Sequence, residues 1–141
     1  QAIRFSEKDV RPMGRQATGV KAMRLNKDTV VGMDVVTSET SDGKLLVIMA
    51  HGYGKQTLIK HYKKQHRGGS GIKTAKVTPK TGEVVRGQMI GQDESELIAI
   101  SRKGQVIRTE LATVPVLGRA TQGVRIMKLE EGDAIATITT L

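Results

Sequence analysis

The sequence has no cysteine and no tryptophan, and it has only one phenylalanine and two tyrosines among 141 residues. Without cysteine the fold has no disulfide bond, and a zinc site would need histidine and carboxylate ligands alone. No run of about 18 apolar residues could cross a membrane as a helix, and no basic segment followed by an apolar one resembles an export signal. These absences predict a cytoplasmic protein with no membrane contact.

The sequence also lacks the apolar pattern of a long helix. No window repeats apolar residues at i, i+3, i+4 and i+7 between capping residues. Short apolar or β-branched segments occur instead at 30–36, 45–49, 97–100 and 134–138, and turn-forming residues such as Asp42-Gly43 separate them. The pattern predicts hairpins of short strands, so the expected fold class is all-β with very little helix.

What the sequence does contain is a repeat of 52 residues. An arginine recurs at this interval, at Arg15, Arg67 and Arg119. Four residues after each arginine comes a glycine, followed by an apolar and then a basic residue, at 19–21, 71–73 and 123–125. Repeats of roughly this size are typical of propellers and solenoids, in which each unit buries its apolar face against a neighbour.

The repeat predicts one domain of propeller-like blades, each a four-stranded antiparallel sheet. We place the repeats at 1–40, 41–92 and 93–141, which makes about 2.7 blades. The first repeat lacks the apolar strand that opens the other two. The sequence therefore predicts a chain that starts inside a blade of a longer protein and that has open sheet edges where blades are missing.

Positive charge follows the same period. The net charge is +9, and the segments 1–25, 53–77 and 105–129 carry +4, +7 and +3 of it, which leaves the remaining residues negative. Neighbouring blades would then present a positive rim suited to a polyanion such as DNA or RNA. A solvated basic face explains any one segment equally well, but three in register favour binding.

The kind of contact expected is with phosphates. Aromatic residues are too few to stack on unpaired bases, so a duplex bent around the rim is favoured. We predict DNA contacts from basic residues of the three segments. They are Arg4, Arg15, Lys21, Lys55, Lys63, Lys64, Arg67, Lys73, Arg108, Arg119 and Arg125. The arginines at the 52-residue interval could instead brace turns inside the protein.

Three segments, 2–15, 52–57 and 118–125, resemble blades of the C-terminal domain of the DNA gyrase A protein. The resemblance extends over essentially the whole chain. It implies a β-pinwheel, a propeller-like ring in which neighbouring blades exchange strands and DNA wraps around the basic outer edge. It also implies that the chain is about half of that domain.

The family carries a glycine-rich box, Gln-Arg-Arg-Gly-Gly-Lys-Gly, which is linked to DNA wrapping. The corresponding residues here are Gln65, His66, Arg67, Gly68, Gly69, Ser70 and Gly71, and all of them match except His66 and Ser70, which makes five matches in seven. His66 and Ser70 replace basic residues of the box. Because later blades of the family carry degenerate copies, and because the segment 52–55 resembles a later blade, we favour a degenerate copy over the true box. The glycines permit either backbone N–H groups close to a phosphate or a plain tight turn.

The resemblance implies a non-catalytic, DNA-wrapping module that supports ATP-dependent negative supercoiling. Its partners would be double-stranded DNA, the rest of gyrase A, and gyrase B, at the bacterial nucleoid. We predict no catalytic residue, metal or cofactor in this chain, whose histidines are His51, His61 and His66. Tyr53 and Tyr62 are expected to pack inside blades, with a hydroxyl near phosphate as a further option.

Two alternatives remain open. The first is the equivalent domain of topoisomerase IV, which resembles gyrase but has fewer or more degenerate blades and does not wrap DNA as fully. The second is a protein-binding propeller of the kelch or chromosome-condensation-regulator type. The well-preserved repeats favour gyrase, and the lack of tryptophan together with the repeated basic segment counts against a protein-binding propeller.

Overall fold

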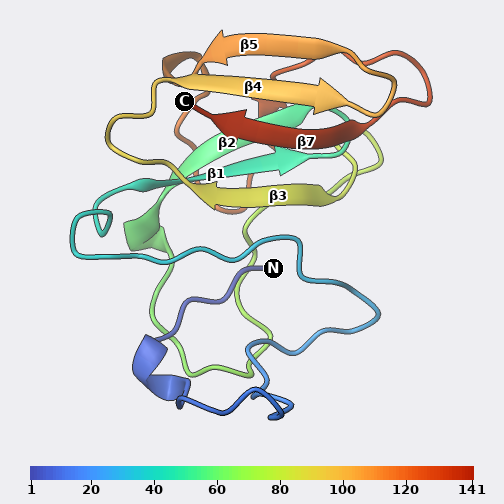
Figure 1. Cartoon of the computed structure of the whole chain (residues 1–141). Helices are drawn as coiled ribbons and strands as arrows, with labels where there is room; N and C mark the ends of the chain where they lie inside the picture. The colour runs from blue at the N-terminus through green and yellow to red at the C-terminus, as the bar shows by residue number, and fades with distance from the viewer.

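A computed structural model describes all 141 residues, and its regular structure is almost entirely β (Figure 1). The strands are β1 (Lys44–Met49), β2 (Tyr53–Leu58), β3 (Val84–Met89), β4 (Glu96–Ser101), β5 (Val106–Glu110), β6 (Val124–Arg125) and β7 (Ile135–Thr140). Helical structure is limited to the short 3-10 turns η1 (Glu7–Asp9), η2 (Ile59–His61) and η3 (Leu111–Thr113). The all-β prediction is confirmed. None of the helical segments has the length and apolar character needed to cross a membrane.

The strands form two antiparallel sheets that pack face to face. The first has the order β3-β1-β2-β6 and the second has the order β5-β4-β7. Figure 1 shows the second sheet lying over the first, with the strand-free residues 1–40, coloured blue to cyan, extending below. Leu97 of β4 lies opposite Thr109 just as Leu45 of β1 lies opposite Thr57, so the two sheets share one register.

Neighbouring repeats exchange a strand. β6 belongs to the third repeat but pairs with β2 of the second, placing Arg125 opposite Tyr53 and Val124 opposite Gly54. One repeat earlier, the same pairing survives as a single bridge between Ala2 and Ile72. The 52-residue period of the sequence is therefore also a period of backbone hydrogen bonding, and the strand exchange implied by the family resemblance is present.

The 3-10 turns follow the same period, since they begin at Glu7, Ile59 and Leu111. Each starts directly after the segment that receives the exchanged strand. Its backbone closes through an N–H to carbonyl bond three residues apart, such as Tyr62 N–H to Ile59 O at 2.9 Å. The repeat is thus preserved even in the first 40 residues, where strands are absent.

The main core lies between the two sheets. Leu46 and Ile48 of β1 face Leu97 and Ala99 of β4, and all four are at most 2% exposed. Alternate positions of β4 are buried, as expected for a strand with one apolar face. Burying a side chain such as Leu46 stabilises the fold by about 1.5–3 kcal/mol, so the packing of β1 against β4 accounts for much of the stability.

The strand predicted at 30–36 is wrong, because residues 1–40 contain no strand. The equivalent strands β3 and β7 pair with β1 and β4, whereas the first 40 residues contain no counterpart of β1. The segment lies instead against the edge of β3, where Asp34 Oδ2 accepts the Met89 N–H at 2.7 Å. Four-stranded blades therefore hold for the first sheet only; the second sheet has three strands.

Gly123 provides a test of the strand exchange. Its φ of 75° favours glycine, and a Cβ at this position would overlap the carbonyl oxygen of Gly54 in β2. We expect Gly123→Ala to lower the free energy of unfolding by about 2 kcal/mol or more, from left-handed strain and lost pairing with β2. Urea denaturation followed by circular dichroism measures the change.

Gly118 is the matched control, because it lies in the same loop and a Cβ there would meet no atom within 4 Å. Gly118→Ala should change the free energy of unfolding by less than about 0.5 kcal/mol. If the two variants lost equal amounts of unfolding free energy, the close approach of Gly123 to Gly54 would be contradicted.

Candidate nucleic-acid interface

Two of the arginines that recur at the 52-residue interval, Arg67 and Arg119, form hydrogen bonds to the preceding repeat. Arg67 Nη1 donates to the carbonyl oxygen of Lys21, and Arg119 Nη1 donates to that of Lys73, both at 2.9 Å. The two hydrogen bonds are equivalent, because donor and acceptor are both shifted by 52 residues. For Arg67 and Arg119, which we call the brace arginines, the structure shows the internal role that the sequence left open. Arg15 is exposed.

A second basic position stays on the surface in all three repeats. Lys21, Lys73 and Arg125, here called the repeat cations, each follow the repeated glycine by two residues and are exposed. Their backbone is fixed, since the carbonyls of Lys21 and Lys73 accept the arginine bonds and Arg125 lies on the edge strand β6. The brace therefore holds the backbone while the cationic side chain remains available to a ligand.

Two further predicted contacts, Lys63 and Lys64, are exposed after η2. Lys64 bridges Arg4 of the first repeat through its backbone, so these lysines lie at the junction of two repeats. With Arg15 and the repeat cations they make six of the seven exposed basic residues among the eleven predicted contacts; the seventh, Arg108, is paired with Glu96.

Lys55 is different, because it is fully buried at 0% exposure. Its Nζ donates to the carbonyl oxygens of Gly118 and Arg119, both at 2.6 Å, and to Thr121 Oγ1 at 3.1 Å. The prediction of a surface contact is wrong for this residue. Its equivalents in the other repeats are Ile3 and Ile107, which is the sequence signal for an interior position. Burial, followed by repulsion from Arg119, lowers the pKa of Lys55 to about 8.

Arg4 also has internal partners. Its Nη1 donates to the carbonyl oxygens of Ile59 at 3.4 Å and Tyr62 at 3.3 Å, at the two ends of η2. One repeat later Gln56 makes the equivalent bonds to the η3 turn, at 2.6 and 3.0 Å. An arginine and a glutamine thus perform the same task, which is to hold the turn of the next repeat.

Arg108 forms the one ion pair of the chain, with Glu96 on the neighbouring strand. The hydrogen bond from Arg108 to this carboxylate raises the pKa of the guanidinium. The pair is solvent-exposed on the Arg108 side, so it contributes little to stability. A phosphate would have to compete with Glu96 for this arginine.

The glycine-rich segment 65–71 forms backbone hydrogen bonds to the first repeat. The N–H of Gln65 donates to Arg4 O at 2.7 Å, the N–H of Gly68 donates to Ala22 O at 2.7 Å, and Gly69 O accepts the N–H of Arg24 at 2.8 Å. The backbone N–H of Gly68 is therefore already bonded within the protein and does not point to a phosphate site. His66 and Ser70 are exposed.

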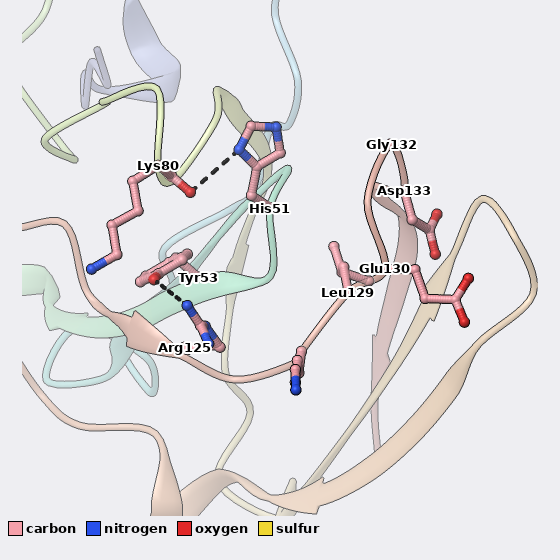
Figure 2. Close-up of a pocket in the computed structure, with 9 residues that line it drawn as sticks. His51, Tyr53, Lys80, Arg125, Leu129, Glu130, Gly132 and Asp133 are labelled. Atoms are coloured by element: carbon pink, nitrogen blue, oxygen red, sulfur yellow. Dashed lines mark hydrogen bonds between the residues drawn. The ribbon is translucent and has the colours of Figure 1, made fainter.

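A hollow of about 340 Å³ opens where β2, the turn at 78–82 and β6 meet (Figure 2). Arg125 Nη2 donates to the Tyr53 hydroxyl at 3.2 Å. Lys80 Nζ and Arg125 Cζ each lie 5.6 Å from the centroid of the Tyr53 ring. The hydrogen bond from Arg125 is the largest cause that lowers the pKa of Tyr53. Lys80 is not among the eleven contacts predicted from the sequence.

The model of the family described as "DNA gyrase C-terminal domain, beta-propeller" matches residues 1–37, 43–87 and 95–141. The chain belongs to this family. It is 44% identical over 137 residues to the gyrase A protein of Staphylococcus epidermidis, and 41% identical to that of Staphylococcus aureus. These alignments cover 96% of this chain and 15% of each relative, so the chain spans a small part of the length of these proteins.

Solved structures share the gyrase-family fold. The C-terminal domain of DNA gyrase A has a TM-score of 0.79 and 23% identity, covering 96% of this chain and 45% of that domain. The C-terminal domain of DNA topoisomerase IV has a TM-score of 0.86 and 19% identity, covering 97% and 42%. The β-pinwheel expectation is confirmed, and the matches favour the gyrase family over kelch-type propellers.

The buried Lys55 predicts a pH dependence of stability. Its pKa is about 8 in the folded chain against an ordinary 10.5, so the unfolded chain binds more protons between these values and stability rises with pH there. We expect this contribution to be on the order of 1–2 kcal/mol, less than the full shift because three hydrogen bonds from Nζ stabilise the charged form.

The variant Lys55→Met keeps the length of the side chain and removes its charge. Urea denaturation across this pH range should show a smaller rise in stability for the variant than for the unaltered chain. Identical pH profiles would mean that Lys55 does not lose its proton in the folded state.

A second variant tests whether Arg67 acts as a brace. Arg67 donates to Lys21 O through Nη1 and to Asp9 O through Nε, each at 2.9 Å, and a lysine cannot reproduce this fork. We expect Arg67→Lys to speed amide hydrogen exchange in residues 9–24 by about tenfold, the equivalent of one hydrogen bond of ~1.4 kcal/mol. Because the charge is retained, unchanged exchange would indicate that the brace does not hold the first repeat.

Proposed function

We propose that this chain is a DNA-wrapping module of a DNA gyrase A protein, which binds the phosphates of a duplex through the repeat cations Lys21, Lys73 and Arg125. The observation that carries the proposal is their spacing. Each occupies the same position of a 52-residue unit and is exposed, and the backbone of each is fixed by contacts to the neighbouring repeat. Cations at a regular spacing can contact the regularly spaced phosphates of DNA, whereas reading a base sequence needs contacts that differ from base to base.

The module would bind DNA through its positive charge and through the shape of its surface, without reading base sequence. Cations on successive repeats neutralise successive phosphates and release counterions, and this gain offsets the energy of bending the duplex. Exposed lysines at the junction of two repeats, Lys63 and Lys64, add to the attraction. The module supplies geometry, and no catalytic step is assigned to it.

In the parent enzyme we propose that wrapping presents one DNA segment to the cleaved segment in a fixed direction. ATP hydrolysis in gyrase B would drive strand passage and yield negative supercoils. The proposed protein partners are therefore the rest of gyrase A, and gyrase B, at the nucleoid of a bacterial cytoplasm. The similarity to gyrase A of Staphylococcus supports this assignment.

The equivalent domain of topoisomerase IV is the second candidate. It is favoured by the TM-score of 0.86 with the C-terminal domain of that enzyme. Religation of a nicked circular DNA with the protein bound separates the two, because a wrapping module shifts the topology of the closed circle and a module that binds without wrapping does not.

A salt titration tests the DNA contacts. If each of the six exposed predicted cations that have no ion-pair partner meets one phosphate, log K plotted against log salt should have a slope near −5 for a duplex, at about 0.9 per contact. The variant Lys73→Gln should lower the magnitude of this slope by about 0.9. The measurement is fluorescence anisotropy of a labelled duplex at several salt concentrations.

The matched control is Arg86→Gln. Arg86 is exposed on β3, the edge of the first sheet opposite to β6, and the substitution removes the same unit of charge. Its slope should equal that of the unaltered chain. A slope near zero for the unaltered chain would contradict DNA binding, and equal losses in both variants would contradict the assigned positions.

A further inference from the structure

Two cations from different repeats converge on one tyrosine. Arg125 comes from the third repeat and hydrogen-bonds the Tyr53 hydroxyl, while Lys80 comes from a turn of the second repeat and lies 5.6 Å from the centroid of the same ring. Figure 2 shows Lys80 and Arg125 on either side of Tyr53, at one end of the hollow. Their charges concentrate positive potential at this end.

No carboxylate neutralises these cations. The one ion pair of the chain joins Arg108 to Glu96 elsewhere. The two acids that line the hollow, Glu130 and Asp133, lie at the other end in Figure 2. Asp133 is committed to its own turn, because its Oδ1 accepts the N–H of Lys103 at 3.1 Å and that of Ala134 at 2.8 Å. An anion entering beside Tyr53 would therefore meet two unpaired cations.

The position of Lys80 is fixed by its turn. Thr81 is fully buried, and its hydroxyl accepts the Thr78 N–H at 3.0 Å. The His51 N–H donates to Thr81 O at 2.9 Å, and its ring Nδ1 lies 3.1 Å from Pro79 O. These bonds hold the backbone of residues 79–81 against the end of β1, so Lys80 needs little reorganisation to bind a ligand.

The arrangement occurs once in the chain. The positions equivalent to Tyr53 are Gln1 and Gln105, and those equivalent to Lys80 are Asp28 and Gly132. Only Arg125 belongs to the series of repeat cations. The hollow therefore adds a specialised site to the repeated contacts at the junction of the second and third repeats.

We propose that the Tyr53–Lys80–Arg125 hollow binds one phosphate group of the duplex and anchors it at this junction, an inference that rests on the proposed function. The Arg125 guanidinium and the Lys80 ammonium would donate to the non-bridging oxygens. Since the Tyr53 hydroxyl accepts from Arg125, its own proton remains to be donated to a phosphate oxygen. The lowered pKa of Tyr53 makes this hydroxyl a better donor.

Two substitutions test the anchor by the duplex titration described above. Lys80 would be a seventh contact beside the six counted above, which takes the expected slope of the unaltered chain to about −6. Lys80→Gln should weaken binding about tenfold, the loss expected of one charge-assisted hydrogen bond, and reduce the magnitude of this slope by about 0.9. Tyr53→Phe should weaken binding by a few-fold with the slope unchanged, because it removes a donor and no charge. Arg86→Gln again provides the charge-matched control.

If Lys80→Gln gave the same affinity and slope as Arg86→Gln, the anchor would be overturned while the DNA-binding function stood. A salt slope near zero for the unaltered chain would instead remove the function on which the anchor depends. The two failures are therefore distinguishable in a single set of titrations.

The chain has only two tyrosines, so NMR of Cζ-labelled tyrosine gives a direct readout. Duplex DNA should shift the Tyr53 signal, identified by its loss in Tyr53→Phe. The signal of Tyr62, which is buried with its hydroxyl on Thr74 at 2.6 Å, should stay in place. Inorganic phosphate serves as the second probe. A Tyr53 signal that moves with phosphate but not with duplex, or with neither, would overturn the anchor.

Discussion

The pairing of β2 with the exchanged strand β6 is the interaction on which the rest of the structure depends. It requires Gly123 to pass so close to Gly54 that no side chain fits between them. Consecutive residues of β2 then hold the next repeat through its backbone oxygens: Lys55 the loop at 118–121, Gln56 the η3 turn, and Thr57 the carbonyl of Leu117 at 3.0 Å. One strand thus fixes the position of a neighbouring blade, and the sheet packing of β1 against β4 adds the apolar area.

At this junction some basic residues form hydrogen bonds inside the protein and others lie on its surface. The brace arginines and Lys55 bind carbonyl oxygens of the neighbouring repeat, where a charged donor contributes about 1.5–3 kcal/mol. The repeat cations stand beside these contacts and are exposed, and of the three Arg125 also hydrogen-bonds Tyr53. A count of positive charge therefore overstates the number of phosphate contacts, but the internal charges hold the exposed ones at a regular spacing. A wrapping surface needs that regularity, because flexible cations would attract DNA without fixing its path.

The hollow at Tyr53 shows how a repeat protein can acquire a site that its repeat does not encode. Arg125 is a member of the repeated series, yet its neighbours Tyr53 and Lys80 have no equivalents in the other units. The strand exchange brings the three together across a repeat boundary. Such a site breaks the symmetry of the basic track, and an anchored phosphate would set the register of the DNA on otherwise similar blades.

The sequence by itself determined the period, the all-β class and the family, because a 52-residue spacing of glycine and arginine survives without any knowledge of contacts. It predicted 45–49, 97–100 and 134–138 as strands, and these form parts of β1, β4 and β7. It was wrong for 30–36, since strand propensity is not enough where the segment forms no backbone hydrogen bonds with its neighbour β3. Only the tertiary structure decided which basic residues face water, because the fate of Lys55, Arg67 or Lys80 depends on carbonyls and rings that are distant in sequence and adjacent only after the strand exchange.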